Sequence, residues 1–194
     1  MPILGTVASQ ISGHLSSPSY DSIATVTVSS PVSTITFSSI PATYTHLQLR
    51  WIGRSATTSG TYDSLYTRFN SDTGSNYSEH AILGYGAGVT VDVNNANTFI
   101  IVEPLCSSGA IANNFGAGYF DILDYANTNK YKTLKGSGGF DNNGNGGTNF
   151  QYGYQAVISG NWRSNTAIST ITFTTGSTSN FAQYSQFALY GIKG

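Results

Sequence analysis

The chain has 194 residues, of which only 9% are Asp, Glu, Lys or Arg, and its formal net charge at pH 7 is -1. Ordinary soluble domains carry about 25% charged residues. The 8 basic residues form no cluster, which argues against nucleic acid as a partner. No stretch approaches the roughly 20 apolar residues of a membrane-spanning helix, so we expect no membrane insertion.

The first twenty residues differ from the rest of the chain, because apolar residues recur there every four positions. Such spacing stacks side chains on one face of a helix, and a helix this short is marginal alone in water. We therefore predict an N-terminal arm (residues 1–20) whose order depends on a partner surface, followed by a β domain (residues 21–194). A frayed end or an extra strand is the alternative. The partner-binding residues expected in the arm are Ile3, Leu4, Val7, Ile11 and Leu15.

From residue 21 onward, apolar and polar residues alternate with a period close to two, as in half-buried strands. Residues 23–28 and 32–37 alternate on either side of a Ser-Ser-Pro turn signal, which predicts a β-hairpin. In residues 46–52, Leu47, Leu49 and Trp51 would share one face. Further strands are predicted at residues 62–69, 77–83, 98–105, 118–125, 130–135, 150–159, 167–175 and 185–192.

About ten short strands separated by Gly-, Asn- and Ser-rich turns predict an all-β fold, a jelly-roll-like antiparallel β-sandwich with the N-terminal arm attached. One short segment is repeated, since residues 33–37 and 169–173 both have the sequence STITF. A jelly roll brings early and late strands together, so these two strands would pair. Chance recurrence of Thr and Ile alternation is the other interpretation.

Residues suited to catalysis or metal binding are few. The three histidines, His14, His46 and His80, have no metal-ligand spacing, and no Gly-x-Ser-x-Gly motif is present. The single cysteine, Cys106, excludes an intrachain disulfide and is expected to be a small apolar residue. Residues 141–146 (DNNGNG) alternate oxygen ligands as calcium loops do, but lack the later glutamate, so a surface turn is the alternative. We expect neither a metal nor a cofactor.

One aromatic residue stands out, because Trp162 follows a predicted strand and precedes Arg163 and Asn165. An aromatic ring beside Arg and Asn suits carbohydrate recognition, and it equally suits a subunit interface. Packing in the core is the alternative for this tryptophan. The candidate residues for a glycan or interface site are Trp162, Arg163, Asn165, Tyr152 and Tyr154.

Several stretches resemble a family of small β-rich virion structural proteins of tailed bacteriophages, especially aquatic and cyanobacterial ones. These stretches are residues 1–5, 8–13, 20–24, 40–50, 69–72, 121–130 and 181–193. The resemblance spans nearly the whole chain and depends on the order of the stretches more than on any single motif. It implies a virion component, either capsid-decorating or tail-associated, and brings no enzymatic motif.

We therefore expect a non-enzymatic virion structural protein, made in the host cytoplasm and displayed on the particle as a capsid cement or tail-associated protein. Its arm would bind other virion proteins, and the protein would form a homo-oligomer, expected to be a trimer. The alternative is a tail-fibre or tail-tip adhesin that binds a host cell-surface glycan. A glycan depolymerase is a third hypothesis, but it needs two carboxylates that face each other across a cleft, and no sequence spacing indicates such a pair.

Overall fold

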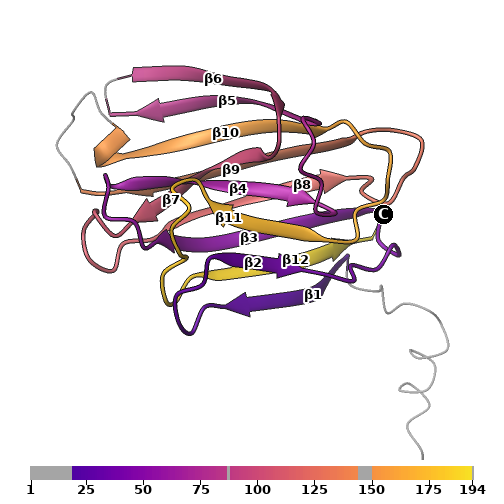
Figure 1. Ribbon diagram of the computed structural model, residues 1–194, viewed down its shortest axis with the longest axis horizontal. Coiled ribbons are helices and arrows are strands. Elements are labelled where there is room, and N and C mark those ends of the chain that lie inside the picture. Colours follow the sequence, from indigo (N-terminus) through magenta and orange to yellow (C-terminus); the bar gives the residue numbers. More distant parts are fainter. Residues whose placement is uncertain (1–18, 87, 144–149, 194) are drawn as a thin grey trace, which may run out of the picture.

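The computed structural model describes residues 19–86, 88–143 and 150–193 (Figure 1). These residues form twelve strands and one short 3-10 helix, η1 (Phe150–Tyr152). The five apolar residues predicted to anchor the arm lie outside the described residues.

The strands form two layers, a large sheet and a small sheet (Figure 1). In spatial order, the large sheet consists of β1 (Tyr20–Thr27), β12 (Gln186–Ile192), β3 (His46–Ser55), β8 (Gly116–Leu123), β9 (Lys132–Asp141), β10 (Gly153–Trp162), β5 (Tyr77–Tyr85) and β6 (Gly88–Asn97). The small sheet consists of β2 (Thr34–Phe37), β11 (Ile171–Thr175), β4 (Tyr62–Phe69) and β7 (Ile100–Ser107).

Strands of the two layers pair with each other at one place. There β3 runs parallel to β7, with Arg54 opposite Cys106 and Ser55 opposite Ser107. Every other pairing between the described strands is antiparallel. The prediction of an all-β sandwich is confirmed.

The alternation of side chains decides which face of each strand enters the core. In β3, Leu47, Leu49 and Trp51 are buried between the sheets, as their spacing predicted. In β4, whose bounds match the predicted strand, the buried face carries Leu65 and Phe69. Burying one face of each sheet against the other removes the apolar side chains from water, which is the main stabilising contribution to such a fold.

The first strands of the chain pair with the last ones, β1 with β12 and β2 with β11. The two STITF segments lie side by side, with Ile35 opposite Phe173 and Phe37 opposite Ile171. The rings of Phe37 and Phe173 meet edge to face, with centroids 6.3 Å apart. The pairing expected for the two segments is therefore confirmed.

The predicted hairpin between residues 23–28 and 32–37 is wrong. The first of these strands belongs to the large sheet and the second to the small sheet, so the Ser-Ser-Pro turn carries the chain from one layer to the other. Val28 N donates to Ser185 O (2.8 Å) instead of to a residue of β2. Crossing between layers places the apolar faces of the two strands on opposite sides of the same core.

Close packing against Trp51 of the same sheet and against Glu103 of the other sheet explains two of the glycines in β8 and β9. A Cβ atom on Gly118 would lie 2.3 Å from the Trp51 ring, and one on Gly138 would lie 2.5 Å from Glu103 O. Only glycine fits at these positions, so β9 continues through residues 136–139 to Asp141, beyond the predicted end at residue 135.

Candidate functional site

The sequence-predicted glycan residue Trp162 is in the core. Its side chain is only 2% exposed, its ring stacks on Tyr77 with centroids 6.2 Å apart, and its Nε1 donates to Asp72 Oδ2 (2.7 Å). Burial raises the pKa of Asp72, but the hydrogen bonds from Trp162 and Asn76 outweigh it and hold this pKa below its usual value. A glycan or interface role for Trp162 is therefore wrong, because its ring face is not accessible.

The remaining candidate residues do not come together. Tyr152 ends η1 just before β10, and Tyr154 lies at the start of β10, whereas Arg163 and Asn165 follow the end of the strand. A ten-residue strand is about 30 Å long, so the two groups are separated by most of the molecule. Tyr154 is buried and donates its hydroxyl to Glu103, while Arg163, Asn165 and Tyr152 are exposed. The prediction of one shared site is wrong.

In the loop at residues 70–76, side-chain oxygen atoms accept hydrogen bonds from backbone amides of the protein. Asn70 Oδ1 accepts from Ser169 N (2.9 Å) and Thr170 N (3.1 Å), and Asp72 Oδ1 accepts from Gly74 N (2.8 Å). Within residues 19–86, 88–143 and 150–193, no three His, Cys, Asp or Glu side chains gather into a metal-binding group. The second half of the predicted calcium loop, residues 144–146, lies outside the described residues.

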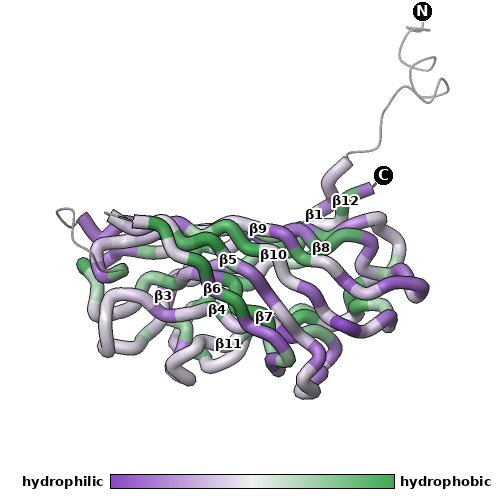
Figure 2. The backbone as a smooth tube through the Cα atoms, turned by 90° about the horizontal axis from the view of Figure 1, so that it is seen from above, coloured by the Kyte–Doolittle hydropathy of each residue, from purple (hydrophilic) through white to green (hydrophobic). Residues whose placement is uncertain are grey.

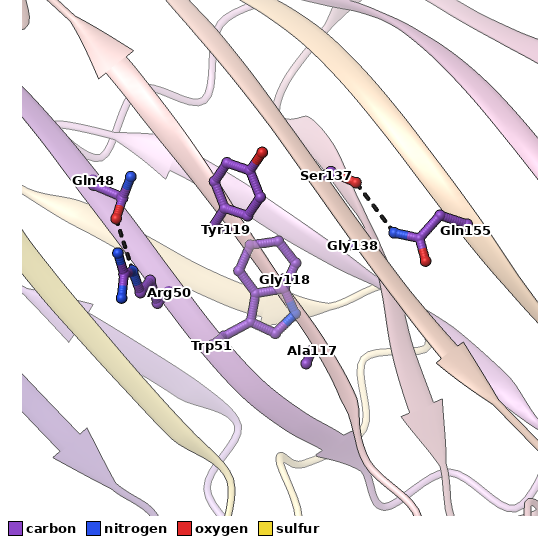
Figure 3. Close-up of a pocket in the computed structure, with 9 residues that line it drawn as sticks. All are labelled: Gln48, Arg50, Trp51, Ala117, Gly118, Tyr119, Ser137, Gly138 and Gln155. Atoms are coloured by element: carbon purple, nitrogen blue, oxygen red, sulfur yellow. Dashed lines mark hydrogen bonds between the residues drawn. The ribbon is translucent and has the colours of Figure 1, made fainter.

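A depression lies on the outer face of the large sheet, the face turned away from the small sheet (Figure 3). Its volume is about 580 Å³. Gln48 and Arg50 stand on one side of it, Ser137 and Gln155 on the other, and Tyr119 between them (Figure 3).

Residue size explains why this face is hollow. Ala117 and Ser137 are short, and they lie among the much longer Arg50, Tyr119 and Gln155. The backbone of the neighbouring glycines forms the floor, with the Trp51 indole against it.

A chain of hydrogen bonds fixes one side of the depression. Asp121 Oδ1 accepts from Gln48 Nε2 (2.8 Å), and Gln48 Oε1 accepts from Arg50 Nε (2.7 Å). The Arg50 guanidinium lies over the Tyr190 ring, 5.4 Å from its centroid. The result is an oriented group of amide, guanidinium and phenol groups, which suits binding of hydroxyl-rich or polar surfaces. The residues lining the depression include no carboxylate pair of the kind that glycoside hydrolysis uses.

A second cavity, of about 400 Å³, lies where β6 extends over β7. Glu103 lines it and accepts hydrogen bonds from Ser64 Oγ (2.8 Å) and from the Tyr154 hydroxyl. Burial raises the pKa of Glu103. A carboxyl group with a raised pKa in a cavity is a feature of some catalytic acids, but here both oxygens are bound by neighbouring hydroxyl groups, which is the arrangement of a structural residue.

The most exposed apolar surface lies on β5, β6 and β10, where Figure 2 shows hydrophobic residues along three adjacent strands. We call it the valine patch, and it consists of Ile82, Val89, Val91, Val93 and Val157. The sequence analysis missed it, because it predicted no strand at residues 88–97. The signal was present, since Val alternates with a polar residue from position 89 to 93.

Comparison of the chain with protein-family models, curated proteins and solved structures finds no match. The resemblance to phage virion proteins therefore stays a prediction, and the function has to be argued from the geometry. No helix among the described residues has the length and apolarity needed to cross a membrane.

Proposed function

We propose that this protein is a non-enzymatic structural component of a phage virion, a β-sandwich that is held against neighbouring proteins in the assembled particle. The observation that supports this proposal most is the valine patch, in which Val89 and Val91 are 71% and 69% exposed. The largest apolar patch on a soluble protein, commonly about 300–600 Å², is often a functional binding surface. The low charge supports the same role, because Ser, Thr and Asn lose less side-chain entropy than Lys or Glu when a neighbour covers them.

In this proposal the protein is a capsid cement or a tail-associated protein, present as a homo-oligomer on the particle surface. Residues 1–20 form its attachment arm, and symmetric placement multiplies the modest energy of each contact.

The test uses purified virions of the phage that encodes the chain. Quantitative mass spectrometry should find the protein in the particle, with hundreds of copies for a cement and few for a tail protein. A chain that lacks residues 1–20 should stay folded and fail to bind particles. Normal occupancy by the truncated chain would refute the anchoring role of the arm, and absence of the protein from virions would refute the whole proposal.

The outer-face depression supports a second candidate function, that of an adhesin for a host cell-surface glycan. Tyr119 is 47% exposed there, beside the oriented Gln48 and Arg50 side chains, and sugars commonly bind to such combinations of a ring with polar groups.

A glycan array with the full chain tests this candidate. Tyr119→Ala should weaken any binding at least tenfold, because it removes the aromatic wall of the depression. Tyr131→Ala is the matched control, since Tyr131 is a similarly exposed tyrosine outside the depression. Equal loss in both variants, or no glycan binding by the wild-type protein, would refute the adhesin function.

A further inference from the structure

The strand pairings leave four edges, which are β1 and β6 in the large sheet, β2 in the small sheet, and the first part of β7, whose last residues pair with β3. An edge strand presents unpaired N–H and C=O groups, and proteins usually protect such edges with charges, bulges, short length or a cover. Comparison of the four edges shows which of them is left open for a partner strand.

Three of the edges are protected. β2 is only four residues long. β1 has a bulge between Ser22 and Ala24, and its Asp21 forms an ion pair with Lys193 (2.6 Å). At β7, Ile101 N donates to Glu79 Oε2 (3.3 Å), so a side chain of the large sheet occupies that edge.

The edge formed by β6 has only one of these protections, a bulge at its far end, where its pairing with β5 shifts register between Asn94 and Asn97. The strand is ten residues long, and its pairing with β5 continues without interruption from Gly88 to Asn94. It contains no Lys, Arg or Pro. Its one charged residue, Asp92, lines the cavity on the inner face, while Val89, Val91 and Val93 project from the outer face. An edge of this length and apolarity is a site at which another strand adds.

The valine patch continues directly from this edge into the sheet. Val91 lies opposite Ile82, and Ile82 lies opposite Val157, so the three side chains form one row across β6, β5 and β10. The patch is on the order of a few hundred Å², less than the roughly 800 Å² that each partner buries in a stable interface. Contact with the valine patch alone is therefore too small for a stable interface. A partner must also form hydrogen bonds with the free backbone N–H and C=O groups of β6.

We propose that β6 of one copy pairs antiparallel with β6 of a second copy, across a two-fold axis at Val91. A second copy supplies the required edge and an equal apolar patch at the same time. In this register Val89 faces Val93 of the second copy, and Asp92 faces a Thr90 hydroxyl instead of another carboxylate. A register centred on Asp92 would place two like charges opposite each other, which disfavours it.

This pairing joins the large sheets of two copies and makes the valine patches continuous across the axis. It produces a dimer, or an even-numbered assembly built from dimers, in place of the trimer expected from the sequence. The pairing rests on the proposed structural role, because both depend on the valine patch, but it is a property of the isolated protein and is testable without virions.

Sedimentation velocity of the full chain tests the pairing directly. We expect the wild-type protein to be dimeric at micromolar concentrations. Val91→Lys should raise the dimer dissociation constant at least tenfold, because it places two positive charges opposite each other across the axis. Val91 is exposed within the subunit, so far-UV circular dichroism of the variant should stay that of the wild-type β protein.

Val157→Lys is the matched control. It introduces the same charge into the same patch, but on β10, two strands away from the β6 edge. The control should stay dimeric, and hydrogen exchange of the β6 amides should be slow in both dimers and fast in Val91→Lys.

A monomeric or trimeric wild-type protein would overturn the pairing, as would equal dissociation by both variants, which would place the contact on the sheet face. If such a protein is nevertheless found in virions, only the pairing fails. If a stable dimer is absent from virions, only the proposed function fails.

Discussion

Individual charged residues serve mainly to hold the fold together. Buried charges are tolerated only when they are hydrogen-bonded, because removal from water is otherwise too costly. Asp63 accepts from Ser55 Oγ (2.6 Å) and Ser177 N (3.0 Å), and Arg54 donates to Ile111 O (2.9 Å). These contacts tie neighbouring strands and loops to each other. Asp63 and Arg54 are therefore used in structural positions.

Glu79 makes stability depend on pH. It is 2% exposed, and burial raises its pKa to about 7, with the nearby carboxylates of Asp92 and Glu103 contributing in the same direction. Hydrogen bonds from Ile101 N and Asn94 oppose this shift without cancelling it. In the unfolded chain the group ionises near 4.5, so the folded state binds the extra proton between about pH 4.5 and 7. Stability is therefore lost as the pH rises through this window.

We expect the free energy of unfolding to fall by about 3 kcal/mol between pH 5 and pH 8, which corresponds to the shift of this one pKa. Urea denaturation at several pH values measures it. Glu79→Gln has no proton to lose at this position and should show a distinctly smaller decrease, with Glu103 contributing the rest. An unchanged decrease in the variant would mean that Glu79 is not the group responsible.

The glycine at position 118 is required by the Trp51 ring. Gly118→Ala should lower the free energy of unfolding by about 1–3 kcal/mol, because the new Cβ has to displace a buried indole. Gly84→Ala is the control, since a Cβ there has nothing within 4 Å and the position has no positive φ. Thermal unfolding of both variants measures the difference, and equal melting temperatures would contradict the close approach of Trp51.

Among the elements, the loop between β4 and β5 depends on one side chain. Asn70 donates from Nδ2 to Ala167 O (2.8 Å), and its Oδ1 accepts from two amides of the segment that leads into β11. Its φ is 50°, a left-handed conformation that Asn tolerates better than Ala. This residue therefore joins two loops that are almost 100 residues apart in sequence.

Asn70→Ala should destabilise the protein by about 2–3 kcal/mol, since it removes these hydrogen bonds and strains the backbone. Asn165→Ala, in an exposed loop, should change the free energy of unfolding by less than about 0.5 kcal/mol. Chemical denaturation compares the two. If both asparagine variants are as stable as the wild type, the cross-link between the loops contributes nothing.

At the scale of the whole molecule, the sandwich is closed by its last strand. β12 lies between β1 and β3, and its Phe187 and Leu189 are buried in the core. No chain that lacks β12 can bury the matching face of β3. The described part of the sandwich, by contrast, makes its first strand pairing at Tyr20, the last residue of the segment proposed as the arm.

Two truncations test this closure. Removal of residues 1–18 should leave the melting temperature within a few degrees of the full chain, whereas removal of residues 186–194 should abolish cooperative unfolding. Circular dichroism on heating distinguishes them. A cooperative transition in the C-terminal truncation would show that the core does not need β12.

The sequence by itself determined the fold class and most of the strands. Local alternation decides which side chains of a strand share a face, so Leu47, Leu49 and Trp51, and the bounds of β4, could be predicted without any partner strand. Low charge, the scarcity of catalytic motifs and the repeated STITF segment are likewise readable from the chain alone.

Only the tertiary structure decided which strands pair and which side chains meet. Alternation within a strand does not specify the strand with which it pairs, so the hairpin predicted for residues 23–37 was wrong. For the same reason the sequence did not reveal that Trp162 is buried in the core and is not part of a glycan site. The outer-face depression and the valine patch each combine residues from three or more strands that are distant in sequence. Their physical basis is the hydrogen-bonded order of the sheet, which depends on long-range pairing and not on any local pattern.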